Sequence, residues 1–195
     1  MKNIITATLA LVLGTQMVLA DNSGVIRMGT EGAYPPWNFI DDDGQVAGFE
    51  RELGDELCKR AELKCEWVTN DWDSIIPNLV SGNYDTIIAG MSITAERDKL
   101  IDFTTNYTLP DPSSYMALST SVDIAKGVVA AQVNTIQSGY IASSGATLVE
   151  FPTPEETIAA VKNGEADAVL ADHAYLAPIA AENSEFVILE EKVLL

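Results

Sequence analysis

Three short segments carry the residues best suited to bind a small charged molecule. The first is Thr30–Trp37, written TEGAYPPW, in which Glu31 can pair with a cation and Tyr34 can stack on a ligand. It directly follows Val25–Gly29, an apolar stretch typical of a buried strand. Ligands of open α/β sheets bind beyond the carboxyl ends of strands, so this position favours a binding role. A stiff surface turn imposed by the two prolines is the alternative.

The second segment, Ala89–Arg97, also follows a predicted strand. Gly90 permits close approach of the backbone to a ligand, and Ser92 offers a hydroxyl and an N–H group. Arg97 carries a planar fork of donors that matches a carboxylate. The alternative is a surface capping turn in which Arg97 pairs with an acidic neighbour in the sequence.

The third segment, Leu170–His173, ends a predicted strand in the second half of the chain. Asp172 can accept a hydrogen bond from an ammonium group, and it can equally serve as the N-cap of the helix that follows. We expect His173 to face solvent rather than to bind a ligand.

Taken together, these segments supply an arginine for a carboxylate, an aspartate for an ammonium and a glutamate for a further cation. That set describes a free amino acid with a basic side chain. The sequence contains no nucleophile–base pair and no glycine loop that would cradle phosphate. One histidine and two cysteines leave little material for a zinc site, so we expect neither a metal nor a cofactor.

Alternating strands and helices must position these segments. Apolar runs and helix signals predict two α/β units joined by a crossover at residues 104–114. A hairpin is predicted around Asp41–Gly44, and a capping box at Thr153 and Glu156. The predicted strands are Val25–Gly29, Cys65–Val68, Thr86–Ala89, Val128–Gln132, Thr147–Phe151, Ala168–Ala171 and Phe186–Leu189. The predicted helices are Glu50–Ala61, a helix capped by Asp73 that runs to Val80, one that begins at Thr135, one after Thr153 that runs to Asn163, and Tyr175–Glu182.

Composition narrows the class of protein. The chain has 195 residues, of which 47% are hydrophobic, so it has enough apolar material for a packed core. With 11 basic and 29 acidic residues, its formal charge is −18. This charge repels phosphate and argues against binding to nucleic acid or to an anionic membrane surface.

The first twenty residues have the features of a secretory signal peptide. Lys2 supplies the positive start, Ile4–Leu13 is a short apolar stretch, and Val18–Ala20 fits a cleavage site after Ala20. An exported chain with an even number of cysteines suggests one disulfide, between Cys58 and Cys65.

Three stretches of the chain resemble the periplasmic solute-binding proteins of polar amino-acid ABC transporters. They are GTEGAYPPWNF, the segment from GFERELGDELCKR to RDKLIDFT, and GEADAVLADHAYL. The resemblance runs from about Val25 to Leu189 and is strongest to the lysine/arginine/ornithine, histidine, arginine and octopine binders. Its most specific parts are Ser92–Arg97, Asp102–Thr104 and the spacing of the two cysteines.

The resemblance implies a type II periplasmic binding protein fold, an α/β architecture of two hinged lobes. Residues 21–109 would form lobe 1 and residues 110–195 lobe 2, with a hinge near 108–112. Arg97 matches the residue that holds the ligand α-carboxylate, helped by Ser92 and the region of Thr135. Asp172 matches the residue that binds the α-ammonium group, together with the Gly90 carbonyl and the Ser92 hydroxyl.

The same resemblance assigns the remaining site residues. Tyr34 and Trp72 match aromatic walls around the ligand side chain, and Glu31 matches an acid that faces the side-chain cation. Cys58 and Cys65 match the family disulfide.

The sequence also departs from the family pattern. Family members often carry Thr or Ser where Ile136 stands. Family chains run on for roughly another third of the mature length, by domain size, and return to lobe 1. We therefore expect the C-terminal return to be missing, which would leave lobe 1 incomplete and make the chain aggregation-prone and a poor binder.

The expected function is non-enzymatic: capture of arginine, lysine, ornithine or histidine in the periplasm, as a monomer, for an inner-membrane ABC permease. A periplasmic dehydratase of cyclic acids on the same scaffold is one alternative, and an opine-binding protein is another. A receptor sensory domain is a third possibility. The dehydratase would need a general acid in the cleft, a role open to Glu31.

Overall fold

Parallel strands organise the first half of the chain. In the computed structural model, which describes residues 24–195, β1 (Val25–Thr30) lies between β5 (Lys64–Thr69) and β6 (Thr86–Ile87). Parallel neighbours require crossovers, and α1 (Phe49–Arg60) supplies the one between β1 and β5. The expected signal peptide, residues 1–20, lies outside the described residues.

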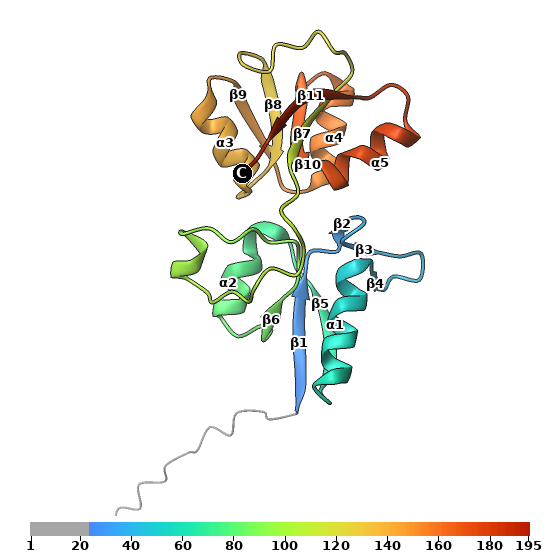
Figure 1. Cartoon of the computed structure of the whole chain (residues 1–195), viewed down its shortest axis with the longest axis vertical. Coiled ribbons are helices and arrows are strands. Elements are labelled where there is room, and N and C mark those ends of the chain that lie inside the picture. Colours follow the sequence, from blue (N-terminus) through green and yellow to red (C-terminus); the bar gives the residue numbers. More distant parts are fainter. Residues whose placement is uncertain (1–23) are drawn as a thin grey trace, which may run out of the picture.

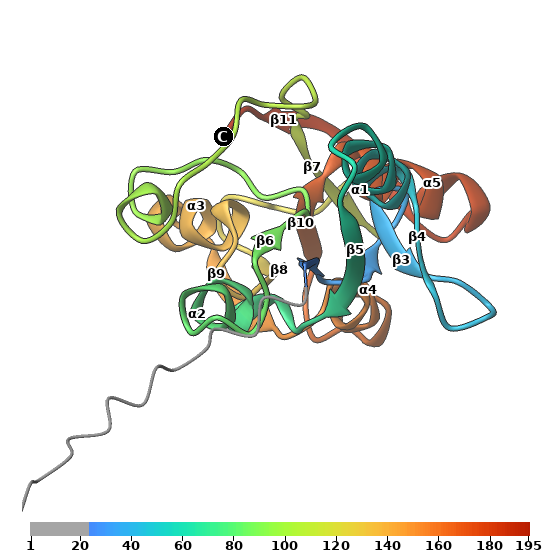
Figure 2. The ribbon, with the colours of Figure 1, turned by 90° about the horizontal axis from the view of Figure 1, so that it is seen from below.

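The second crossover of this unit combines a 3-10 turn, η1 (Trp72–Ser74), with α2 (Ile75–Val80). Figures 1 and 2 show α1 and α2 on opposite sides of the three strands. A small antiparallel sheet follows β1, and its members are β2 (Ala33–Tyr34), β3 (Asn38–Ile40) and β4 (Val46–Ala47). The predicted hairpin is therefore confirmed as β3 and β4.

A five-stranded mixed sheet forms the core of the second unit, in the order β11-β7-β10-β8-β9. Helices cover both faces because strand residues alternate sides: Met116 and Val169 join one apolar cluster, whereas Tyr115 and Leu170 join the other. The strands are β7 (Ser113–Ala117), β8 (Val128–Gln132), β9 (Thr147–Phe151), β10 (Ala168–Asp172) and β11 (Val187–Val193). The helices are α3 (Ile136–Ser144), α4 (Pro154–Asn163) and α5 (His173–Glu182).

The start of α4 confirms the predicted capping box. The Thr153 hydroxyl accepts from the Glu156 N–H, and the Glu156 carboxylate accepts from the Thr153 N–H. Gly164 closes the helix in the left-handed conformation (φ 76°).

One described segment, residues 100–112, links the two units and follows η2 (Arg97–Lys99). The predicted crossover at 104–114 overlaps it but extends too far, because Ser113 already pairs in β7 between β10 and β11. No helix among residues 24–195 has the length and apolar character needed to span a bilayer.

Other predicted boundaries were wrong in detail. Asp73 does not cap α2, because it lies inside η1 and the helix begins at Ile75. The strand predicted at Thr86–Ala89 ends at Ile87. The sequence pattern gave no signal for β2, since the segment that contains it reads as a proline-rich loop.

The predicted disulfide joins Cys58 near the end of α1 to Cys65 in β5. Unreduced, denatured protein should therefore show no free thiol, whereas the reduced protein should show two. The pair of substitutions Cys58→Ser and Cys65→Ser should lower the free energy of unfolding by about 2–3 kcal/mol, because the bridge restricts a short loop in the unfolded chain. Two titratable thiols in the unreduced protein would reject the bridge.

Candidate functional site

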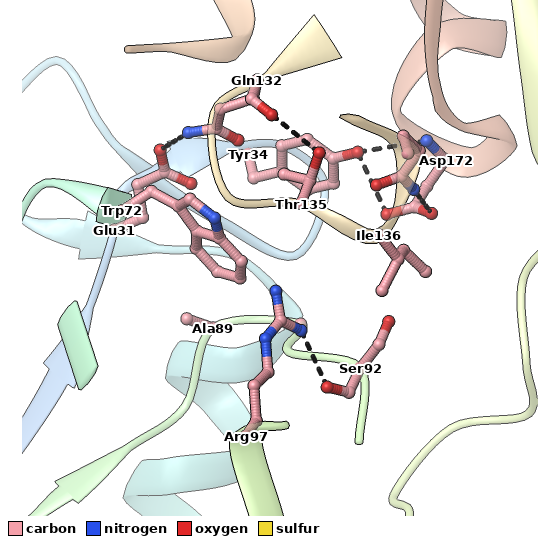
Figure 3. A pocket seen from close by; sticks show the side chains of 12 residues that line it. Glu31, Tyr34, Trp72, Ala89, Ser92, Arg97, Gln132, Thr135, Ile136 and Asp172 are labelled. Atoms are coloured by element: carbon pink, nitrogen blue, oxygen red, sulfur yellow. Dashed lines mark hydrogen bonds between the residues drawn. The ribbon is translucent and has the colours of Figure 1, made fainter. Parts of the chain in front are cut away.

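A cavity lies where the two units face each other (Figure 3). The structure brings all eight residues proposed from the sequence into its lining: Glu31, Tyr34, Trp72, Gly90, Ser92, Arg97, Thr135 and Asp172. Four further residues complete the lining: Ala89, Gln132, Ile136 and Gln137.

Strand ends explain why these residues meet. Glu31 follows β1 directly, and Ala89 and Gly90 follow β6 in the same sheet. On the opposite unit, Gln132 is the last residue of β8 and Asp172 the last residue of its parallel neighbour β10. The cavity therefore lies between the carboxyl ends of parallel strands of two sheets.

Arg97 presents an uncompensated positive charge to the cavity. Its guanidinium donates to the carbonyl oxygens of Ser92 (2.8 Å) and Asn134 (3.0 Å) and lies 5.4 Å from the centre of the Trp72 ring. Within residues 24–195, no carboxylate lies within ion-pair distance of it. Burial lowers the pKa of Arg97 from its ordinary value, and a bound carboxylate would supply the missing counter-charge. A surface pair with an acidic sequence neighbour, the alternative considered above, does not form.

Glu31 lies on the side of the cavity away from Arg97, near Trp72 (Figure 3). One carboxylate oxygen accepts a hydrogen bond from the amide of Gln132, which belongs to the opposite unit. Burial raises the pKa of Glu31 to about 7; the charge of Asp71 adds to the rise, and the Gln132 hydrogen bond opposes it. No described cation pairs with this side chain, so a cationic ligand group could pair with its carboxylate.

Asp172 is fixed by two donors. The Tyr34 hydroxyl donates to Oδ2 (3.0 Å), and the Gln137 amide donates to Oδ1 (2.8 Å) and to the Ser113 hydroxyl (3.0 Å). Burial raises the pKa of Asp172 to about 6, and the charge of Asp111 adds to the rise. Asp172 occupies the N-cap position of α5, but its side chain caps no backbone N–H there because its oxygens face the cavity partners.

Aromatic rings give the cavity its apolar walls. Trp72 lies beside Arg97, and Tyr34 separates Glu31 from Asp172 in Figure 3. The Tyr34 ring also stacks on Tyr175 of α5, with centroids 4.4 Å apart. Such walls suit the methylene chain and the flat or cationic end of a ligand side chain.

One predicted detail needs correction, at His173, and several lining residues were missed. The Thr135 hydroxyl caps α3 by accepting from Ser138 N–H and donates to the Gln132 carbonyl. His173 does not simply face solvent, because its Nδ1 atom lies 3.0 Å from the Ser114 hydroxyl. Gln132 could have been identified as the last residue of a predicted strand, whereas Gln137 in the first turn of α3 gave no such signal.

Several hydrogen bonds cross the cavity from one unit to the other. Besides Glu31 with Gln132 and Tyr34 with Asp172, the Asn134 carbonyl accepts from both Arg97 (3.0 Å) and the Trp72 indole (3.4 Å). The walls of the cavity are therefore held together by the same side chains that would contact a ligand. Among residues 24–195, no cluster of three metal-ligating side chains is present.

Comparison with known proteins agrees with this arrangement. The family model described as bacterial extracellular solute-binding proteins, family 3, matches residues 26–142. The octopine-binding periplasmic protein of Rhizobium meliloti is 33% identical, over 88% of this chain and 68% of that protein. The lysine/arginine/ornithine-binding periplasmic protein of Escherichia coli is 31% identical, over 75% of this chain and 60% of that protein.

A solved structure is also similar. The crystal structure of a periplasmic His/Glu/Gln/Arg/opine family-binding protein from Silicibacter pomeroyi, in complex with lysine, is 71% identical with a TM-score of 0.85. The match covers 87% of this chain and 78% of that one. The family match, the relatives and the shared fold show that this chain belongs to family 3 of the bacterial extracellular solute-binding proteins.

Proposed function

We propose that this protein binds a basic L-amino acid, such as arginine or lysine, in the periplasm and delivers it to an ABC permease. One observation supports this most strongly: among residues 24–195, one guanidinium and two carboxylates without an ion-pair partner line a single aromatic-walled cavity. This charge pattern complements one carboxylate and two cationic groups, and a basic amino acid carries that set.

In the proposed complex, Arg97 binds the α-carboxylate with a bidentate pair of hydrogen bonds. Asp172 binds the α-ammonium group together with the Gly90 carbonyl and the Ser92 hydroxyl. Glu31 faces the cation at the end of the side chain, and Trp72 and Tyr34 enclose the methylene groups. Residues 108–112 serve as the hinge between lobe 1 (21–109) and lobe 2 (110–195), and the protein acts as a monomer.

Relatives support this ligand class. The names of the matched proteins include binders of octopine, of arginine and of lysine, arginine and ornithine, and the Silicibacter structure contains lysine. Octopine carries the arginine skeleton together with a second carboxylate, so an opine is the alternative ligand and the charge pattern favours the free amino acid. Export to the periplasm, with cleavage after Ala20, forms part of the proposal.

A dehydratase of cyclic acids is the second candidate, favoured by one observation. Glu31 has a pKa raised to about 7, which suits a general acid at neutral pH. A cyclic diacid, however, would place its second carboxylate near Glu31 or Asp172, because Arg97 is the one cation that the described residues contribute to the cavity lining. The charge pattern therefore favours binding of a basic amino acid over this reaction.

A thermal-shift panel separates these functions. The protein is heated with each common amino acid, with octopine and with prephenate as the cyclic acid. We expect arginine, lysine or ornithine to raise the melting temperature most, because a ligand that binds the folded state stabilises it by mass action. Stabilisation by prephenate without stabilisation by any basic amino acid would reject the proposal.

Affinity for a basic amino acid should depend on pH. The ligand needs ionised Glu31 and Asp172, whose pKa values in the free protein are raised to about 7 and about 6. Binding must therefore displace protons below these values. We expect arginine affinity to rise from pH 5 to pH 8 and then level off, with a loss of at least about tenfold per pH unit below pH 6.

The same two groups should affect the stability of the free protein in the opposite direction. Their folded-state pKa values exceed those of the unfolded chain, so the folded state binds more protons and the contribution of these groups to stability falls as pH rises from about 4 to 7.

The pH dependence of ligand affinity can be measured directly. Calorimetric titrations with arginine in buffers of different ionisation enthalpy would measure the protons released on binding. A pH-independent affinity would contradict both assignments.

A further inference from the structure

A buried carboxylate lies behind the cavity and is not part of its lining. Glu50 is the second residue of α1 and has no exposed surface. The helix begins at this point because Gly48 adopts φ 106°, and the N–H groups of Phe49 and Glu50 donate to the carbonyls of Pro36 (3.1 Å) and Trp37 (2.9 Å). This start directs the Glu50 side chain into lobe 1.

Three donors converge on this carboxylate. Oε1 accepts from the Gly90 N–H (2.5 Å) and from the Tyr107 hydroxyl, and Oε2 accepts from the Asn38 amide (2.7 Å). Asn38 is itself fully buried, and its Oδ1 accepts from the Gly32 N–H (2.7 Å). Burial and the neighbouring Glu50 charge raise the pKa of the Tyr107 hydroxyl, which keeps it a donor.

The ends of this network coincide with the parts of lobe 1 that shape the cavity. Gly90 lines the cavity, Gly32 follows Glu31 in the chain, and Tyr107 lies in the segment that links the two units. The N–H and C=O groups of a trans peptide point in opposite directions. A donor held by Glu50 or Asn38 therefore fixes the carbonyl on the other side of the same peptide, at Ala89 and at Glu31.

We infer that Glu50 is a positioning residue for ligand binding: it orients the backbone at Glu31 and at Gly90 through one buried hydrogen-bond network. The inference rests on the proposed function, since it names what orients that site. Ligand affinity, as well as stability, then depends on a residue that is not itself part of the cavity lining.

Both side-chain oxygens of residue 50 must accept hydrogen bonds for the network to form. Glutamine has the same shape but offers one oxygen and one NH2 group, so Glu50→Gln leaves either Gly90 or Asn38 facing a donor. If Asn38 turned its amide to accept from the new NH2 group, it would present a donor to Gly32 instead. The substitution must therefore lose one hydrogen bond of the network. In the Asn38 branch a buried donor would be left without a partner, which is costly; in the other branch the Gly90 N–H would keep only its longer bond to the Tyr107 hydroxyl (3.2 Å).

A second substitution can restore the network. In the double variant Asn38→Asp/Glu50→Gln, the new carboxylate at 38 accepts from both the residue-50 amide and the Gly32 N–H, and the oxygen at 50 still accepts from Gly90. Asn38→Asp alone would place two carboxylates in contact in a buried site, which is unfavourable. The double variant should therefore bind L-arginine more tightly than either single variant.

Calorimetric titration with L-arginine tests the inference, with the melting temperature and the amide exchange of Gly32 and Gly90 measured on ligand-free protein. Glu50→Gln should weaken arginine binding by about tenfold or more and speed exchange at one or both amides. The double variant should return affinity to within about threefold of wild type. The matched control is Glu52→Gln, the same change at an exposed position of α1, which should alter neither affinity nor exchange.

Every other outcome either supports or overturns the positioning role of Glu50. Wild-type affinity and exchange in Glu50→Gln, or a double variant no better than the single one, would overturn the inference. If Glu50→Gln does not fold, recovery of arginine binding in the double variant supports it, and lack of recovery overturns it. If wild-type protein binds no basic amino acid, the proposed function fails, and the exchange of Gly32 and Gly90 still decides whether Glu50 orients these loops.

Discussion

Replacing Arg97 by alanine is expected to lower the affinity for L-arginine by at least about 100-fold. The guanidinium has carbonyl oxygens and an aromatic ring as neighbours, and among residues 24–195 no carboxylate neutralises it. The ligand α-carboxylate would supply its only anionic partner in the cavity, and removal of one member of a desolvated charge pair leaves the other without compensation. Isothermal titration calorimetry measures the loss.

Two controls make this result specific. Agmatine, which is arginine without its carboxylate, should bind weakly to the wild-type protein and with unchanged affinity to Arg97→Ala. Arg60→Ala removes an arginine that is exposed on α1 and pairs with Glu56, so it should leave arginine affinity unchanged. A loss of less than tenfold in Arg97→Ala would reject this assignment.

Glu31→Gln is expected to lower the affinity for free arginine and lysine by about tenfold or more. The affinity for free glutamine should change by less than about threefold. Glutamine at this position keeps the shape of the side chain and an oxygen that can accept from Gln132, but it loses the negative charge. A cation taken from water needs an acid as partner, whereas a neutral side chain does not. Titrations with matched charged and neutral amino acids measure this difference, and equal losses for both classes would show that Glu31 does not select the cation.

The parts of the fold that could be predicted are those set by local sequence. Thr153 and Glu156 form their capping box within four residues of one another, and β8 and β9 are apolar runs with the predicted bounds. By contrast, β7 begins with Ser113 and Ser114 after a proline-rich stretch and reads as a loop. It is a strand because β10 and β11 pair with it and because Gln137 and His173 provide partners for its two serine hydroxyls.

The residues of the candidate site likewise divide into those that local sequence identifies and those whose importance depends on distant partners. Glu31 and Asp172 stand at the ends of predicted strands, and Arg97 lies in the loop that follows another, so their chemistry and position could be identified together. Gln137 and Glu50 could not, because each lies in the first turn of a helix and its importance comes from partners distant in the sequence. A carboxylate at the second position of a helix is ordinarily a favourable interaction with the helix dipole, and nothing in its local sequence distinguishes Glu50 from that case.

The most direct test of the account is a crystal structure of the protein with L-arginine. We expect the ligand in the cavity between the two units, with its α-carboxylate on the Arg97 guanidinium, its α-ammonium group on Asp172 and its side-chain guanidinium facing Glu31. Electron density for arginine outside this cavity, or inside it with the carboxylate away from Arg97, would contradict the account.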